Sequence, residues 1–238
     1  SFFAFVLSLF RYNITEIKEG WVSGPGMVGG ENWSQKLAPG YELGTFYMPH
    51  YMGLSQDGYF LFSTEAGGVT RDITNAERIV AGSALPDFEI GWSNQIEFLS
   101  NFELNFTFRA ILGYDMLNAT RLIFANPNGL MPNGNILQEG LDEKARGLAS
   151  SPAISDYYLE EASFVRLDNI TLAYNLNASR IKYVSNVRLY VTSNNLLTIT
   201  GYSGLDPEIT YQGVSFGIDQ YNVYPKTRTL TFGINLSF

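Results

Sequence analysis

The chain of 238 residues contains no cysteine and only one histidine, His50. Without cysteine there can be no disulfide scaffold, cysteine-ligated zinc, iron–sulfur cluster or thiol nucleophile. A single histidine excludes metal sites built from several imidazoles and limits serine–histidine–aspartate catalysis to His50. That residue lies in a turn-forming segment, Met-Pro-His-Tyr, with no G-x-S-x-G motif nearby. We therefore expect a loop histidine, no cofactor and no enzymatic activity.

Charge and long apolar runs are also scarce. Charged residues make up 16% of the chain, and 23 acidic against 15 basic residues give a net charge of -8. No run of lysine or arginine offers the clustered basic surface that nucleic acids require, so a nucleic-acid partner is not expected. The apolar segment 2–10 is far shorter than the roughly 20 residues of a transmembrane helix. It also lacks the basic region and cleavage site of a signal peptide.

Alternation of apolar and polar residues is the dominant pattern in what remains. Between Thr229 and Phe238 the two kinds alternate without a break. This run matches the roughly 9 to 11 residues of a tilted membrane-spanning strand, whereas strands of soluble proteins are usually about 5 to 6 residues long. The pattern predicts six long strands, at about residues 2–12, 87–98, 102–114, 162–176, 186–198 and 226–238.

The connections between these strands alternate in length. Short turns near 99–101 and 177–185 contrast with long loops at 13–86, 115–161 and 199–225. Outer-membrane barrels have short periplasmic turns and long extracellular loops, and loops of this length are uncommon in compact soluble domains. Six strands alone would leave unpaired sheet edges in hydrocarbon. We therefore expect an all-β fold, an antiparallel transmembrane β-barrel fragment with long extracellular loops.

Several segments carry a family resemblance, most strongly the C-terminal YPKTRTLTFGINLSF at 224–238, which resembles the terminus of SusC/RagA-type TonB-dependent transporters. Further segments are similar to family blocks in the same order: 82–91, 113–118, 162–175, 187–200 and 201–209. The segment 201–209, GYSGLDPEI, matches the family's G-x-D-P-E pattern. Residues 66–78 lack the acidic positions of the family's D-x-N-G-D-G-x-I loop, so no cation site is expected there.

The resemblance implies a barrel of about 22 strands with an N-terminal plug, in the outer membrane of a Gram-negative cell. Residues 1–238 would be its C-terminal part, about six strands, with the plug and earlier strands outside this chain. The implied function is TonB-dependent import of oligosaccharides or oligopeptides. The implied partners are a SusD-like surface lipoprotein lid, the TonB complex acting through the plug, the remainder of the barrel and membrane lipid. The alternative is a soluble extracellular carbohydrate-binding β-sandwich, which would explain the aromatic content and the low charge.

Aromatic residues at two places in the chain are candidate functional groups. Tyr47, Tyr51 and Tyr59 belong to an aromatic-rich first long loop and would suit stacking on sugar rings or burial under a lid protein. Alternatively, they pack a loop hairpin that turns at Asp57-Gly58. Phe238, a terminal aromatic that closes an alternating strand, resembles the signal read by barrel-assembly machinery, or is an interfacial girdle residue.

Two carboxylate pairs could in principle perform acid–base chemistry on a glycosidic bond, Asp206 with Glu208 and Glu160 with Glu161. Asp206 precedes a proline in a turn-forming setting, where a carboxylate commonly accepts backbone N–H bonds. We therefore expect a structural role for Asp206 and Glu208, and a solvated rim at Glu160 and Glu161.

Two loop segments complete the candidates. Residues 24–29 satisfy G-x-G-x-x-G, but neither a following helix nor a βαβ pattern supports nucleotide binding, so a flexible outer loop is expected. Residues 141–148 predict a short helix in the second long loop, with acids early and bases late. It would either face a partner or pack over the barrel mouth.

Overall fold

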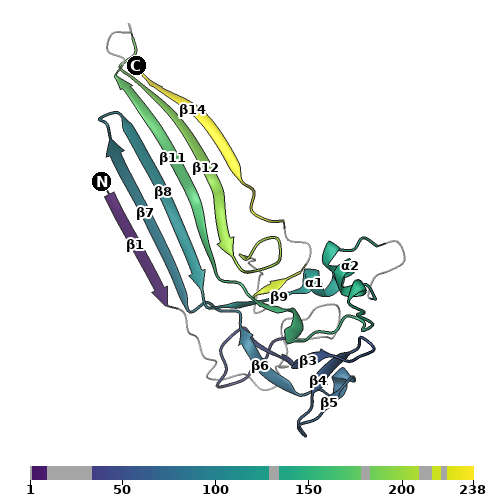
Figure 1. Ribbon diagram of the computed structural model, residues 1–238. Helices are drawn as coiled ribbons and strands as arrows, with labels where there is room; N and C mark the ends of the chain where they lie inside the picture. The colour runs from purple at the N-terminus through teal and green to yellow at the C-terminus, as the bar shows by residue number, and fades with distance from the viewer. Residues whose placement is uncertain (1, 10–33, 129–133, 178–182, 209–215, 221–223) are drawn as a thin grey trace.

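The main element of the computed structural model, which describes residues 2–9, 34–128, 134–177, 183–208, 216–220 and 224–238, is a six-stranded sheet (Figure 1). Its order is β1-β7-β8-β11-β12-β14, and every neighbouring pair is antiparallel. The strands are β1 (Phe2–Leu9), β7 (Phe88–Phe98), β8 (Phe102–Leu112), β11 (Phe164–Asn177), β12 (Asn186–Thr200) and β14 (Thr229–Ser237). All six predicted strands are confirmed, with ends that differ by a few residues.

The short and long connections lie at opposite ends of this sheet. Phe98 pairs with Phe102 across the β7–β8 turn, where Leu99 and Ser100 have φ values of 50° and 63°. Such left-handed values fit a tight hairpin to the right-handed twist of its strands. Both short connections leave the sheet near the chain's C-terminus, and the long connections leave at the other end (Figure 1). The predicted asymmetry is therefore confirmed.

One face of the sheet is apolar and uncovered. Trp92 lies opposite Phe108, and their rings stack with centroids 5.8 Å apart. The exposed apolar side chains on the strands include Phe5, Leu7, Phe88, Trp92, Ile96, Phe98, Val165, Leu172, Leu176, Leu189, Leu230, Phe232, Ile234 and Leu236. Because these side chains are exposed, no second sheet covers this face within the described ranges. The sandwich architecture is therefore not observed.

The opposite face of the sheet is polar. Side chains bond across the strands there: the Ser93 and Thr107 hydroxyls lie 2.9 Å apart, and the Arg188 guanidinium lies 3.2 Å from the Glu103 carboxylate. Glu103 also accepts a 2.7 Å hydrogen bond from the Asn105 amide. Alternation along the strands therefore gives the sheet one face suited to hydrocarbon and one suited to a polar interior.

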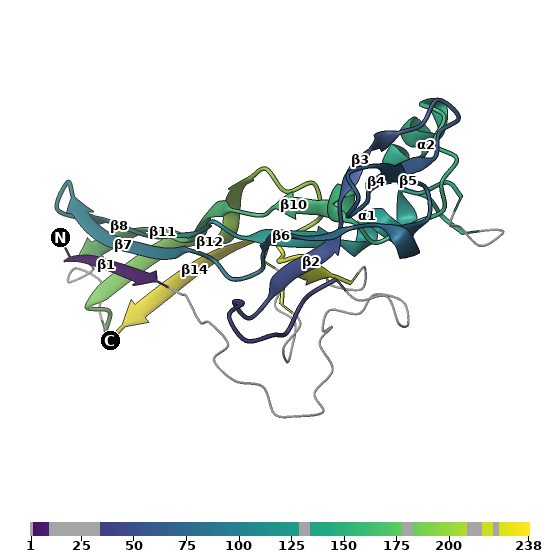
Figure 2. The ribbon, with the colours of Figure 1, turned by 90° about the horizontal axis from the view of Figure 1, so that it is seen from below.

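The described residues of the long connections fold into a layer of small elements at one end of the sheet, which we call the loop subdomain (Figure 2). In the ranges given above, it contains three small sheets, ordered β2-β6, β3-β4-β5 and β10-β9-β13, with two α-helices and two 3-10 turns. Their bounds are β2 (Thr45–Pro49), β3 (Tyr51–Leu54), β4 (Phe60–Ser63), β5 (Val69–Thr70), η1 (Ile73–Asn75), β6 (Arg78–Ser83), β9 (Asp115–Asn118), α1 (Ala119–Phe124), α2 (Gln138–Ala145), η2 (Asp156–Tyr158), β10 (Leu159–Glu161) and β13 (Ile218–Asp219).

The main hydrophobic core of the described chain lies in this loop subdomain rather than on the sheet. Its buried members come from all three long connections: Phe46, Met48, Phe60, Phe62, Ala84, Leu117, Ala119, Leu122, Leu148, Ile154, Tyr158 and Ile218. Loops of this length remain ordered only if they bury apolar area of their own. The core therefore makes the three connections one packed unit.

Gly58 joins the first of these connections to the second. Its φ is +82°, and a Cβ atom there would lie within 1.8 Å of the Gly147 carbonyl oxygen. The Gly58 carbonyl accepts a 2.8 Å hydrogen bond from Ala149 N, and Ser150 Oγ accepts one of 2.7 Å from Phe60 N. The predicted hairpin turning at Asp57-Gly58 is confirmed, since β3 pairs with β4 across it.

The predicted helix at 141–148 is found, but it begins at Gln138 and ends at Ala145. Within the described part of the chain, no helix is both long and apolar enough to cross a membrane.

Candidate functional site

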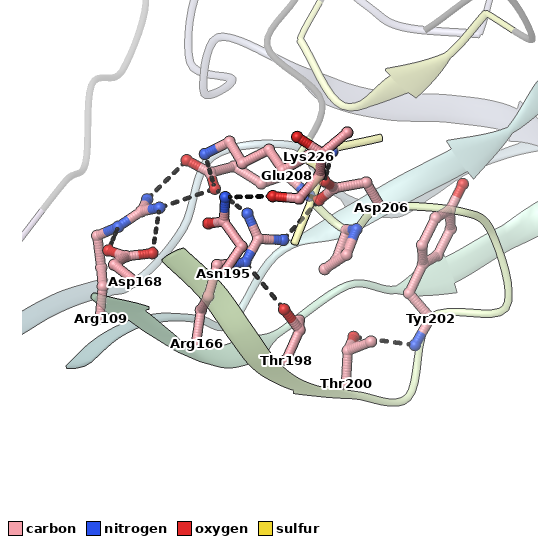
Figure 3. A network of polar contacts seen from close by, with 12 residues as sticks. Arg109, Arg166, Asp168, Asn195, Thr198, Thr200, Tyr202, Asp206, Glu208 and Lys226 are labelled. Carbon is pink, nitrogen blue, oxygen red and sulfur yellow. Dashed lines mark hydrogen bonds and ion pairs between the residues drawn. The ribbon is translucent and has the colours of Figure 1, made fainter. Parts of the chain in front are cut away.

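An ion network lies on the polar face of the sheet, where β8, β11 and β12 meet the loop subdomain (Figure 3). Arg109 of β8 and Arg166 of β11 are directly paired in register, so their side chains share this face. Both guanidinium groups bind Glu208: Arg109 NH1 at 2.6 Å and Arg166 NH1 at 2.8 Å. Lys226 Nζ reaches the same carboxylate at 2.5 Å. Glu208 thus receives three cations from three separate segments.

Asp206 fixes the turn that carries Glu208. It accepts a 2.7 Å bond from Arg166 NH2 and 2.9 Å bonds from the backbone N–H groups of Glu208 and Lys226. Tyr114 OH donates to the Pro207 carbonyl at 2.7 Å. The expectation that Asp206 accepts backbone N–H bonds in a turn is confirmed. The carboxylate pair therefore anchors the segment after β12 to the sheet.

A β-bulge supplies the remaining carboxylate. The pairing of β11 with both β8 and β12 shifts between Leu167 and Asn169, which leaves Asp168 as the extra residue. From there Asp168 binds Arg109 Nε at 2.9 Å. Bulges commonly re-aim a side chain in this way. The bulge shifts the alternation of β11 by one residue, and Asp168 lies at the shift, beside the cations.

The surrounding cations favour the ionised form of Glu208. Burial raises the pKa of Glu208, but hydrogen bonds and charges from Arg109 and Lys226 outweigh it and hold this pKa below its usual value. Arg166 is only 2% exposed, and its Nε donates to Thr198 Oγ1 at 3.0 Å. The carboxylates of Asp206 and Glu208 are both engaged by cations, which agrees with the structural role expected for this pair. No group of three or more metal-ligating side chains occurs among the described residues.

A second, smaller polar cluster contains Glu160, which was predicted to be a solvated rim residue. Glu160 accepts bonds from Ser203 N at 2.9 Å and Asn118 Nδ2 at 3.1 Å. Its neighbour Glu161 is exposed. The prediction of a solvated rim is therefore wrong for Glu160, which holds the segment that follows β12 to the loop subdomain, and is confirmed for Glu161.

The three tyrosines named from the sequence lie in different surroundings. Tyr51 packs against Tyr157 and Phe60, with ring centroids 4.7 and 5.5 Å away. Tyr47 is partly buried under the Lys36 ammonium, which lies 4.4 Å from its ring centroid. Tyr59 is 42% exposed. Tyr59 therefore offers the most surface to a partner.

The other candidates lie apart from the network. Phe238 is 86% exposed beyond the end of β14. His50 is a loop residue, as expected, and its Nδ1 lies 2.5 Å from Asp156 Oδ2, which joins the first long connection to the second. The glycine motif at 24–29 lies outside the described residues.

The sequence did not single out four members of the network: Arg109, Arg166, Asp168 and Lys226. Charged residues on the polar face of a strand are ordinary in a barrel, so their positions alone carried no signal. The blocks 162–175 and 201–209 hold only four charged residues between them, close to the 16% of the whole chain, so they gave no hint of the network either.

No family model matches the sequence. The chain is 33% identical over 232 residues to TonB-dependent receptor P3 of Formosa agariphila, covering 86% of this chain and 23% of the relative. It is 32% identical over 174 residues to TonB-dependent receptor SusC of Bacteroides thetaiotaomicron, covering 70% of this chain and 16% of the relative.

Among solved structures, the RagAB peptide transporter matches with a TM-score of 0.73 at 26% identity, over 99% of this chain and 27% of that one. The RagAB peptide importer in its 'closed-closed' state gives the same TM-score at 27% identity, over the same shares of the two chains. This chain therefore spans about a quarter or less of the relatives that it matches. Shared sequence and fold show that it belongs to the SusC/RagA-type TonB-dependent transporters and forms part of their all-β barrel.

Proposed function

We propose that the protein containing this chain imports oligosaccharides or oligopeptides across the outer membrane, driven by the TonB complex. The observation that carries this proposal is a sheet with one uncovered apolar face, joined at one end to a packed loop subdomain. The 11 residues of β8 extend about 36 Å, which a barrel tilt of ~45° reduces to about 25 Å, the height of the apolar band of such barrels. Strands β7, β8, β11 and β12, with 11 to 15 residues each, are therefore long enough to cross this band.

In this proposal, residues 1–238 are the C-terminal part of the barrel. The polar face lines the interior, and the loop subdomain lies outside the cell. Tyr59, exposed on the β3–β4 hairpin, contacts substrate or a SusD-like lid lipoprotein, and Tyr47 and Tyr51 support that region. Phe238 serves as the barrel-assembly signal. The names of the relatives, a peptide transporter and TonB-dependent receptors, support import without separating glycan from peptide.

Uptake by the native host tests this function. A strain lacking the gene, and the same strain with the gene restored, would receive labelled oligosaccharides and oligopeptides too large for porins. We expect restored uptake of one class, and its loss when an uncoupler collapses the proton gradient that energises TonB. Equal uptake by both strains across the whole panel would contradict the proposal.

The proposal assigns no catalytic step to this chain, because Asp206 and Glu208 are bound by Arg109, Arg166 and Lys226. Incubating the purified transporter with its substrate and measuring the mass of the recovered oligomer checks this point. We expect an unchanged mass.

A further inference from the structure

A polar cavity of about 300 Å³ lies beside the ion network, between the end of β12, the 204–207 turn and the start of β14. Its wall includes Arg166, Asn195, Thr198, Asp206, Lys226 and Arg228. Because Arg166 bonds to Thr198 across the strands, this cavity is on the same polar face of the sheet as Arg109. It therefore opens toward the interior side of the sheet and away from the apolar face.

The carboxylates at this cavity have little accepting capacity left. Asp206 is 6% exposed and already accepts three hydrogen bonds, from Arg166, Glu208 N and Lys226 N. Glu208 is not among the residues that line the cavity, and it accepts hydrogen bonds from Arg109, Arg166 and Lys226. Negative charge near the cavity is therefore already neutralised.

Hydrogen-bond donors, in contrast, remain available. Lys226 Nζ has three N–H bonds, and Glu208 is the acceptor for one of them. Thr198 Oγ1 accepts from Arg166, which leaves its own proton free, and Asn195 Nδ2 donates to Thr227 O at 3.1 Å with one of two hydrogens. Figure 3 shows Asn195, Thr198 and Lys226 gathered around Arg166.

Arg228 adds a positive charge to these hydrogen-bond donors. The cations Arg109, Arg166 and Lys226 are matched by the carboxylates Asp168, Asp206 and Glu208. Arg228 lines the cavity and is exposed, and no ion pair joins it to any residue that the structure describes. One uncompensated guanidinium, with neutral donors beside it, has the chemistry that recognises a carboxylate.

We propose that this cavity binds a carboxylate group of the transported oligomer, with Arg228 as the charged contact and Thr198, Asn195 and Lys226 as further donors. The inference rests on the proposed import function and narrows its substrate to oligomers that carry acidic groups. The same carboxylate chemistry occurs in a glutamate or aspartate side chain and in a uronic acid sugar.

Binding to the purified full-length transporter tests the proposal with two matched pairs of probes. The first pair is a terminally blocked tetrapeptide with one glutamate and its glutamine counterpart. The second pair is a trisaccharide of uronic acid and its methyl ester. We expect the wild-type protein to prefer the acidic member of one pair, which identifies the source, and this preference to weaken with rising salt.

The variant Arg228→Gln should lower the affinity for that acidic probe roughly tenfold and leave its neutral counterpart unchanged, because a hydrogen bond to a charged group is lost. Thr198→Val should give a smaller loss of the same kind. Arg146→Gln is the matched control, since Arg146 is an exposed arginine that pairs with Glu143 at the end of α2, away from the cavity.

Three results would overturn the inference: no acid preference in the wild-type protein, equal losses for acidic and neutral probes in Arg228→Gln, or no loss in that variant. Uptake by the host is measured separately, and none of these three binding results contradicts it. Failure of the acidic site is therefore distinguishable from failure of the proposed import.

Discussion

The charged guanidinium of Arg166 is almost completely buried, which is rare for a charged side chain. Its side chain is 2% exposed, and its Nε, NH1 and NH2 atoms donate to Thr198, Glu208 and Asp206 respectively. A buried ion pair adds little net stability relative to apolar residues, but removing one partner leaves an uncompensated charge. Arg166 therefore fixes where the 206–208 turn sits more than it strengthens the fold.

The substitution Arg166→Ala should consequently be costly. It leaves Asp206 and Glu208 without their shared guanidinium, and breaking a buried pair of this kind costs roughly 3–5 kcal/mol. We expect a lower midpoint of thermal unfolding for the full-length transporter and faster protease cleavage near residue 205. The exposed pair Arg71–Asp57 provides the comparison, because Arg71→Ala should change neither measurement. Similar effects of the two substitutions would contradict this role.

Acidification should weaken the same network through Glu208. Its pKa is lower in the folded protein than its usual value near 4.5, so its stabilising contribution is complete above that value. The contribution is lost as the pH falls through the folded pKa. Thermal unfolding of the wild-type protein and Glu208→Gln should therefore differ by a constant amount at about pH 6–8, and the difference should shrink below about pH 4.5. A difference that grows on acidification would contradict the assignment.

At the scale of elements, the six strands were predictable because an environment with two opposite faces imposes a period of two on every strand. The loop subdomain was not, because its order comes from packing between residues such as Phe46 and Ile218, far apart in sequence. Only part of the ion network could be predicted from the sequence. A turn carboxylate at Asp206 follows from local chemistry, but the bulge that directs Asp168 to Arg109 depends on the register of three strands.

Gly58 provides a test of how two long connections are joined. The substitution Gly58→Ala would drive a Cβ into the Gly147 carbonyl and separate the hairpin from residues 147–150. Gly67→Ala is a matched control: its φ of +79° imposes the same backbone strain as the +82° of Gly58, but no atom lies within 4 Å of the added Cβ. Limited proteolysis of the full-length transporter should cut the β3–β4 hairpin faster in Gly58→Ala than in Gly67→Ala. Equal rates would show that backbone strain alone matters.

The facing of β14 allows a second test at this scale. Phe232 is 76% exposed on the apolar face, whereas the neighbouring Thr231 points to the polar face opposite Thr192. A carboxylate on the lipid side near mid-strand costs on the order of 1–2 kcal/mol more than one on the inner side. Phe232→Asp should therefore reduce the amount of folded transporter in outer-membrane fractions far more than Thr231→Asp. Equal amounts of the two variants would reverse the assigned faces.

At the scale of the whole molecule, the described sheet is open. Strands β1 and β14 are its edges, and each has a pairing partner on one side only. Within hydrocarbon, unpaired backbone N–H and C=O groups are not tolerated, so further strands must complete the ladder on both sides. The match to about a quarter of much longer transporters agrees with this requirement.

The loop core also has a consequence for the order of folding. Its contacts join residues from 46 to 218, and such distant contacts form late, after the entropy of closing the intervening chain has been lost. The intervening chain contains β7, β8, β11 and β12, whose ends deliver the loops to one another. A slip in the register of any of these strands would separate the core residues that come from different long connections. The loops would then be exposed to proteases. Closure of the loop core therefore reports that the strands of the main sheet have paired correctly.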